Sequence, residues 1–210
     1  MKRARGKGLL GALLLAAGMH GAAAPPAARE ATAVFAGGCF WCLEADFEKL
    51  PGVLDVQSGY TGGHVPDPGY EQVSAGGTGH AEAVRVRYDP ARVSYVQLLD
   101  YFWKHIDPTV KDRQFCDVGS QYRSAIFPAT DDERRAAQAS RDALVASGRF
   151  AQVFTTIEPA AAFYPAEDYH QDYYRKNPLR YNFYRYTCGR DQRLEEIWGA
   201  WVDAVDALVQ

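Results

Sequence analysis

Methionine is nearly absent from this sequence. Only two of the 210 residues are methionine, Met1 and Met19, and none follows position 19. Methionine side chains oxidise readily to the sulfoxide. A chain almost free of methionine therefore suits a protein that works among oxidants, although this absence alone decides nothing about function.

A long apolar run is also absent. The longest such stretch near the start, Leu9–Met19, is shorter than the roughly 20 residues that a membrane-spanning helix needs. It follows a basic start made of Lys2, Arg3, Arg5 and Lys7, and small residues come after it. These are the parts of a secretory signal peptide.

We therefore predict a signal peptide over residues 1–24, a flexible tether over 25–30 and one folded domain over 31–210. An uncleaved membrane anchor is the alternative for the leader. The prediction implies a periplasmic or secreted protein with no stable membrane insertion after cleavage.

The chain lacks an excess of positive charge. It has 23 Lys and Arg residues against 26 Asp and Glu, and four of the basic residues belong to the predicted leader. Without these four, 19 basic residues face 26 acidic ones, a net charge of −7. Nucleic acids bind to clustered basic surfaces, so no nucleic-acid partner is expected.

Apolar residues are sufficient for a core, at 47% of the chain, and their spacing alternates between strand and helix patterns. Strands are predicted over Ala31–Ala36, Val53–Tyr60, Val84–Tyr88, Tyr122–Phe127 and Val153–Ile157. Helices are predicted over Phe40–Leu50, Val96–Ile106, Asp131–Ser147 and Arg193–Val209, and Thr61–Gly79 is predicted to be a glycine-rich loop. This order indicates a single-domain α/β sandwich, one sheet with helices packed on it.

Four cysteines are present, Cys39, Cys42, Cys116 and Cys188. In an exported protein an even number first indicates structural disulfides. A domain of this size does not need such crosslinks, however, and the spacing of Cys39 and Cys42 is that of redox motifs. The number and spacing of the cysteines are therefore compatible with redox chemistry as well as with structural disulfides.

Cys39 has the sequence context of a nucleophile. Gly37 and Gly38 allow a sharp turn from strand to helix, which places Cys39 at the helix N-terminus. Unpaired N–H groups and the helix dipole there favour a thiolate, and we expect them to lower the pKa of Cys39. Phe40 and Trp41 add an aromatic surface that can hold a methyl-sulfur group. A buried or disulfide-bonded cysteine pair among core aromatics is the structural alternative.

Several segments together resemble the MsrA family of peptide methionine sulfoxide reductases. The matching segments are Phe35–Trp41, Gly59–His64, Gly79–Ala83, Asp117–Ser124 and Phe163–Gln171. They come in the family's order and span about 31–177, nearly the whole predicted domain. The resemblance implies an MsrA-type catalytic domain with a ferredoxin-like core.

The resemblance also implies roles for individual residues. Cys39 would attack the sulfoxide sulfur and become a sulfenic acid while methionine is released. Glu82 would protonate the sulfoxide oxygen, which requires a raised carboxyl pKa.

Five further residues match the family's substrate-binding groups. Tyr70 and Tyr122 would hydrogen-bond the oxygen and Asp117 would support them, while Phe40 and Trp41 would cradle the methyl group. Fixed placement of these groups around a chiral sulfur would select one epimer.

Structural roles are the alternative for the same residues. Glu82 could cap a strand facing water, Tyr70 and Tyr122 could belong to the core or its rim, and Asp117 could be a turn residue. His80 and His170 have no second histidine at ligand spacing, so structural roles are expected for both and no metal is predicted.

Two cysteines are candidates for the thiol that resolves the sulfenic acid. Cys188 lies in a C-terminal segment containing Gly189 and resembles the recycling cysteine in the tails of many family members, so we favour it. Cys42, one helical turn from Cys39, is the alternative, and Cys116 is given no role.

The resemblance implies an enzyme without a metal or organic cofactor. Its substrates would be methionine-S-sulfoxide in oxidised proteins, in peptides or free, and its electrons would come from thioredoxin or a thioredoxin-like partner. One rival is a thioredoxin-like disulfide oxidoreductase using Cys39 and Cys42. Another is a non-catalytic binding module stapled by Cys39–Cys42 or Cys42–Cys188.

Overall fold

The computed structural model describes residues 30–199. The predicted signal peptide, most of the predicted tether and the end of the predicted terminal helix lie outside these residues. Within them, no helix is both long and apolar enough to cross a membrane.

The centre of the fold is a βαββαβ unit. Its elements are β1 (Ala31–Gly37), α1 (Phe40–Phe47), β2 (Val53–Thr61), β3 (Ala81–Tyr88), α3 (Tyr95–Lys104) and β6 (Ser124–Ile126). These strands lie in the order β6-β1-β3-β2, and all three neighbouring pairs are antiparallel. This is the ferredoxin-like arrangement, so the predicted fold class and core are confirmed.

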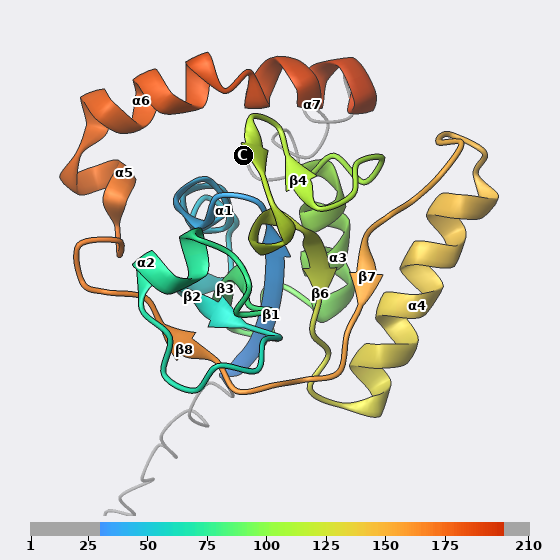
Figure 1. Ribbon diagram of the computed structural model, residues 1–210. Helices are drawn as coiled ribbons and strands as arrows, with labels where there is room; N and C mark the ends of the chain where they lie inside the picture. The colour runs from blue at the N-terminus through green and yellow to red at the C-terminus, as the bar shows by residue number, and fades with distance from the viewer. Residues whose placement is uncertain (1–29, 200–210) are drawn as a thin grey trace, which may run out of the picture.

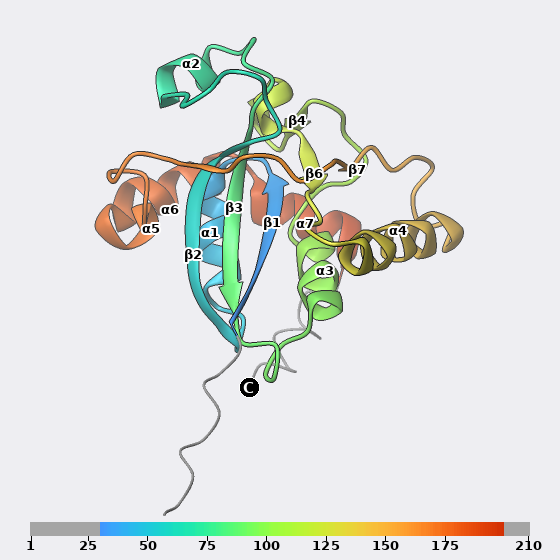
Figure 2. The ribbon, with the colours of Figure 1, turned by 90° about the horizontal axis from the view of Figure 1, so that it is seen from below.

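Two short strands extend the sheet at its edges. β7 (Thr156–Ile157) pairs in parallel with β6, and β8 (Tyr164–Pro165) pairs antiparallel with β2. The chain between them crosses the sheet face opposite α1 (Figure 2). There Phe163 packs over alanines of the central strands, and Arg85 stacks on its ring at 4.8 Å. This segment therefore covers the second face of the sheet.

Local signals explain where the helices begin. Ser94 caps α3 and exchanges hydrogen bonds with Gln97, a capping box that satisfies otherwise unpaired N–H groups. Thr130 caps α4 (Asp131–Ala146), whose first turn holds three acidic residues that complement the helix dipole. The short helices α2 (Tyr70–Ser74) and η1 (Ser120–Tyr122) lie in connecting loops.

The main core lies between the sheet and the helices on one face. Phe35 of β1 stacks on Phe47 of α1 at 5.2 Å and on Phe102 of α3 at 5.0 Å. These rings are almost completely buried, and such burial contributes about 1.5–3 kcal/mol per side chain. The packing fixes α1, and with it the turn that carries Cys39.

The C-terminal part of the described chain is helical. It forms α5 (Tyr173–Lys176), α6 (Pro178–Thr187) and α7 (Arg190–Trp198). Figure 1 shows α6 and α7 running along one side of the molecule, past α1 and the hairpin of β4 (Arg113–Gln114) and β5 (Asp117–Val118). Tyr181 of α6 packs on Cys42 and Ala45 of α1. Residues remote in sequence thus meet beside Cys42.

Several predicted boundaries were wrong. The helix predicted over Phe40–Leu50 ends at Phe47, the predicted glycine-rich loop contains α2, and the predicted strand over Val153–Ile157 is only β7. The sequence patterns did not predict the β4–β5 hairpin, β8, α5 or α6. These elements are short or exposed on one side, so their apolar spacing is weak.

Candidate active site

Cys39 lies where β1 turns into α1. It is the N-cap residue of the helix, as predicted. Gly38 before it has φ +82°, and a side chain there would stand 2.5 Å from Cβ of Gln114. Glycine avoids both the strain and the collision, so the turn can press against the β4–β5 hairpin.

A small pocket opens at the Cys39 sulfur. Its volume is about 70 Å³, room for about two water molecules. The lining residues are Cys39, Phe40, Trp41, Tyr70, Glu82, Asp117, Tyr122 and Tyr184. The structure thus brings together around one cavity seven residues that the sequence singled out from four separate segments, and adds Tyr184.

Glu82 is the buried acid of this pocket. It lies on β3 with 2% of its surface exposed, and its Oε2 accepts a hydrogen bond of 3.0 Å from the Phe40 N–H. Burial raises the pKa of Glu82 to about 8, although that hydrogen bond opposes the rise. Its carboxyl group is therefore mostly protonated at neutral pH and can donate a proton.

The Cys39 and Cys42 thiols are both free and both buried. Burial raises the pKa of Cys39 well above its usual value, and the nearby Glu82 and Asp117 raise it further. The expected lowering by the helix N-terminus is therefore wrong, because the loss of water and these acidic neighbours favour the thiol. The hydrogen bond with Cys39 instead lowers the pKa of Cys42.

Tyr70 and Tyr122 present their rings to the pocket from α2 and η1. Burial raises the pKa of both phenols, to about 12 for Tyr70, so both keep their protons and can donate hydrogen bonds. Glu167 positions α2 by accepting a 2.8 Å hydrogen bond from the Tyr70 N–H and a 2.9 Å bond from the Tyr60 hydroxyl. The segment around Glu167 therefore supports the pocket from outside it.

Trp41 forms the aromatic wall of the pocket. Its ring stacks on Tyr173 at 3.7 Å, and its indole N–H donates to Nδ1 of His170 at 3.0 Å. His170 also lies 5.0 Å from the Phe40 ring and 4.4 Å from the Tyr70 ring, centroid to centroid. The structural role expected of His170 is therefore to hold this wall, and burial lowers its pKa so that it stays neutral.

His80 also has a structural role. Its Nδ1 accepts from the Gly63 N–H at 3.1 Å, and its Nε2 lies 2.7 Å from the Val65 carbonyl oxygen. It therefore ties the loop that leads to α2 onto β3.

Asp117 and Tyr184 line the remaining side of the pocket. The Tyr184 hydroxyl donates to Oδ2 of Asp117 at 2.5 Å, and burial raises the pKa of Asp117. The sequence analysis missed Tyr184, which is one of 13 tyrosines. No local pattern marks it, because α6 brings it to the pocket only through tertiary packing.

Cys188 is bonded to Cys116 in this structure. The role predicted for Cys188, resolving a sulfenic acid on Cys39, stays a prediction. Cys116 is exposed and Cys188 partly exposed, in contrast to Cys39 and Cys42. The two sulfurs and Asp117 are the only group of three metal-type ligand atoms gathered within residues 30–199, but sulfurs joined in a disulfide are not thiolate ligands.

Comparison with known proteins places this chain in a family. The family model described as "Peptide methionine sulfoxide reductase" matches residues 31–202. A Limosilactobacillus reuteri protein, "Peptide methionine sulfoxide reductase MsrA", is 50% identical over 169 residues, which cover 80% of this chain and 96% of that protein.

Two further similarities differ in their coverage. The Vibrio cholerae protein "Peptide methionine sulfoxide reductase MsrA/MsrB" is 53% identical over 169 residues, but this chain spans only 45% of its length. The solved structure of reduced Mxr1 from Saccharomyces cerevisiae superposes with TM-score 0.66 at 34% identity, covering 72% of this chain and 88% of that one.

Proposed function

We infer that this chain, which belongs to the peptide methionine sulfoxide reductase family, reduces methionine sulfoxide to methionine through Cys39. The observation that carries the inference is the shared pocket of Cys39 and Glu82, where burial keeps a carboxyl protonated beside a sulfur nucleophile. Reduction of a sulfoxide needs both a nucleophile and an acid, because the oxygen leaves the sulfur only when it is protonated. A thioredoxin-like exchange enzyme would have no use for Glu82.

The first step transfers oxygen from the substrate to the enzyme. Glu82 donates its proton to the sulfoxide oxygen as the Cys39 sulfur attacks, and the thiol proton of Cys39 restores Glu82. The oxygen ends on Cys39 as a sulfenic acid, and the substrate leaves as a thioether. One thiol is oxidised by two electrons and one sulfoxide is reduced by two.

The pocket's size and asymmetry favour one epimer. A cavity of about 70 Å³ admits only the methyl and sulfinyl end of the side chain. With the methyl group against Phe40 and Trp41 and the oxygen toward Glu82, Tyr70 and Tyr122, only one configuration directs the sulfur to Cys39. We propose methionine-S-sulfoxide, free or in proteins and peptides, as the substrate.

The enzyme needs no metal or organic cofactor in this scheme. A second cysteine displaces the oxygen as water and forms an intramolecular disulfide, which a thioredoxin-like dithiol protein then reduces. The sequence favoured Cys188 for this step, with Cys42 as the alternative.

We further propose that the protein acts outside the cytoplasm. The residues before position 25 have the composition of a signal peptide. An exposed Cys116–Cys188 disulfide suits an oxidising compartment. Cell fractionation tests this proposal, and recovery of the protein from the cytoplasm with all four thiols reduced would contradict it.

The activity is tested with a peptide containing methionine sulfoxide and dithiothreitol as reductant. We expect reduction of the S epimer alone, and no reduction by Cys39→Ser. Disulfide exchange without sulfoxide reduction by the wild type would instead support the thioredoxin-like alternative.

A further inference from the structure

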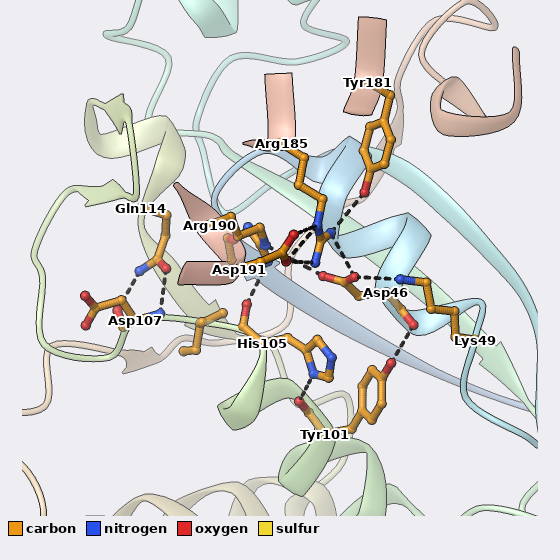
Figure 3. A network of polar contacts seen from close by, with 12 residues as sticks. Asp46, Lys49, Tyr101, His105, Asp107, Gln114, Tyr181, Arg185, Arg190 and Asp191 are labelled. Carbon is orange, nitrogen blue, oxygen red and sulfur yellow. Dashed lines mark hydrogen bonds and ion pairs between the residues drawn. The ribbon is translucent and has the colours of Figure 1, made fainter. Parts of the chain in front are cut away.

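The active-site helix α1 carries two buried acidic residues with different surroundings. Asp46 belongs to a charge cluster, in which it pairs with Arg185 at 2.9 Å and with Arg190 at 3.6 Å (Figure 3). Glu44, two residues earlier and 1% exposed, lies in a different setting, because the charged groups that act on its carboxyl are two further acids. Burying a carboxyl group without a cation costs free energy. Glu44 is therefore expected to serve a purpose other than charge pairing.

Glu44 binds the residue that starts α5. Its Oε1 accepts a hydrogen bond of 3.1 Å from the Asp172 N–H. Asp172 is the N-cap residue of α5 and has φ +52°, a left-handed conformation that is uncommon for residues other than glycine. The bond therefore joins α1 to an unusual backbone position 128 residues further along the chain.

The residue after Asp172 braces the aromatic wall of the pocket. Tyr173 stacks on Trp41 with 3.7 Å between the ring centroids and 5° between the ring planes. Trp41 lies three residues before Glu44 on α1, so the two side chains are neighbours on the helix surface. Trp41 and Glu44 thus contact two consecutive residues of the C-terminal segment, and a shift of Asp172 would move the Tyr173 ring away from Trp41.

Other bonds fasten the same segment to neighbouring elements. The Gln171 side chain accepts from the Ser58 N–H and donates to the Ser58 carbonyl, both at 2.9 Å, which ties the segment to β2. His170 accepts from the Trp41 indole, as described above. Of these bonds, the one from Asp172 to Glu44 joins the backbone of the segment to α1.

We propose that Glu44 is a positioning residue for the wall that contacts the substrate's methyl group. By holding Asp172, it keeps Tyr173 stacked on Trp41 and so sets how closely the wall fits that group. The inference rests on the proposed function, in which Trp41 lies against the methyl group. Glu44 is not among the residues that line the pocket, so it acts through Trp41 and takes no part in proton transfer.

A closely held wall should distinguish a methyl group from a longer alkyl group. The pocket has a volume of only about 70 Å³, and a closely packed site accommodates an added methylene poorly. One methylene typically changes kcat/KM by about 10–200-fold. The ratio of kcat/KM for methionine sulfoxide to that for ethionine sulfoxide therefore reports how firmly the wall is held.

The test compares the S-sulfoxides of methionine and ethionine in the same peptide, with dithiothreitol as reductant. For the wild type we expect a ratio in the range of about 10–200. Glu44→Met keeps a long unbranched side chain but removes the acceptor, and it should lower the ratio by about tenfold. The loss should appear as a higher KM for the methionine substrate, while kcat stays near that of the wild type because Cys39 and Glu82 are unchanged.

The conservative variant Glu44→Gln should rescue the wall. Its amide oxygen can accept the same hydrogen bond from the Asp172 N–H. Burial raises the pKa of Glu44 to about 7, so the native side chain is itself neutral in a large fraction of molecules at neutral pH. We therefore expect the ratio and KM of Glu44→Gln to match those of the wild type.

The matched control is Glu48→Met. Glu48 also joins α1 to α5, but it accepts from the Tyr174 hydroxyl and pairs with Arg175 at 2.7 Å. Its replacement weakens the contact between the same two helices at a different point. The substrate ratio of Glu48→Met should therefore equal that of the wild type.

Three results would overturn the inference: an equal loss for both substrates in Glu44→Met, the same drop in ratio in Glu48→Met, or failure of Glu44→Gln to restore the ratio. Each would mean that Glu44 only stabilises the packing of α1. A wild type that reduces both sulfoxides equally well would also overturn it. Absence of sulfoxide reduction by the wild type would instead refute the proposed function.

A second variant keeps the inference testable where Glu44→Met does not fold. Tyr173→Leu removes the stacked ring itself and leaves the bond between Glu44 and Asp172 in place. It should lower the ratio as Glu44→Met does, and an unchanged ratio would overturn the inference.

Discussion

The two cysteine pairs of this protein occupy opposite environments. Cys39 and Cys42 are free thiols inside the fold, 7% and 2% exposed. Cys116 and Cys188 are bonded to each other at the surface, across 72 residues of sequence. Desolvation and neighbouring charged groups shift the pKa values of the buried pair, whereas the exposed pair is accessible to other molecules and crosslinks distant elements. The predictions below separate chemistry in the buried pair from stability provided by the exposed one.

Glu82→Gln should have the largest effect. The amide cannot protonate the sulfoxide oxygen, so kcat should fall by about 10²–10⁴-fold. Wild-type activity should also fall as pH rises through about 8, because Glu82 then ionises, and the variant should lack this decline. Steady-state rates between pH 6 and 10, at roughly half-unit intervals, measure both effects; a wild-type rate in the variant would remove Glu82 as the acid.

The same carboxyl links stability to pH. Glu82 would ionise near pH 4.5 when unfolded but near 8 in the fold. Between these values the folded state keeps a proton that the unfolded state releases, so wild-type stability should fall as pH rises. Urea unfolding across this window should show a shallower decline for Glu82→Gln, and parallel curves would contradict the raised pKa.

Opening the exposed disulfide should affect stability rather than chemistry. Cys116→Ser/Cys188→Ser releases a loop of 72 residues, which should lower the free energy of unfolding by roughly 4 kcal/mol. Denaturant unfolding of both proteins measures the loss. The amount of product in a single turnover should stay at one equivalent, and loss of that product would show that the two pairs do not act separately.

Removing one pocket hydroxyl should have the smallest effect. Tyr122→Phe or Tyr70→Phe deletes a hydrogen bond to the reacting oxygen, which should lower kcat by about tenfold, or about 1.4 kcal/mol. Tyr186→Phe, at an exposed site, is the matched control and should leave kcat unchanged. Equal rates for all three variants would place the oxygen away from Tyr70 and Tyr122.

Much of the fold was predictable because its central elements carry strong patterns. The strand from Ala31, the turn at Gly37 and Gly38 and the helix from Phe40 follow from alternation, glycine and apolar spacing. The short helix that holds Tyr70 was not predicted, because five residues in a glycine-rich loop give no periodicity. Contacts with Glu167, almost a hundred residues away, decide its position.

The candidate site also contains residues that the sequence predicted and residues that it did not. The sequence predicted seven of the pocket residues, because several segments together match one family in the same order. Tyr184 and the charge cluster of Asp46, Arg185 and Arg190 had no such signal, because α6 and α7 meet α1 only in the folded chain.

By itself, the sequence determined the fold class, the family and the turn that presents Cys39, since these depend on local spacing and residue type. Only the tertiary structure decided which thiols are buried, which are joined and which carboxyl keeps its proton. Those properties depend on the removal of water and on charges brought together from distant segments, as the raised pKa of Glu82 and the pairing of Cys116 with Cys188 show.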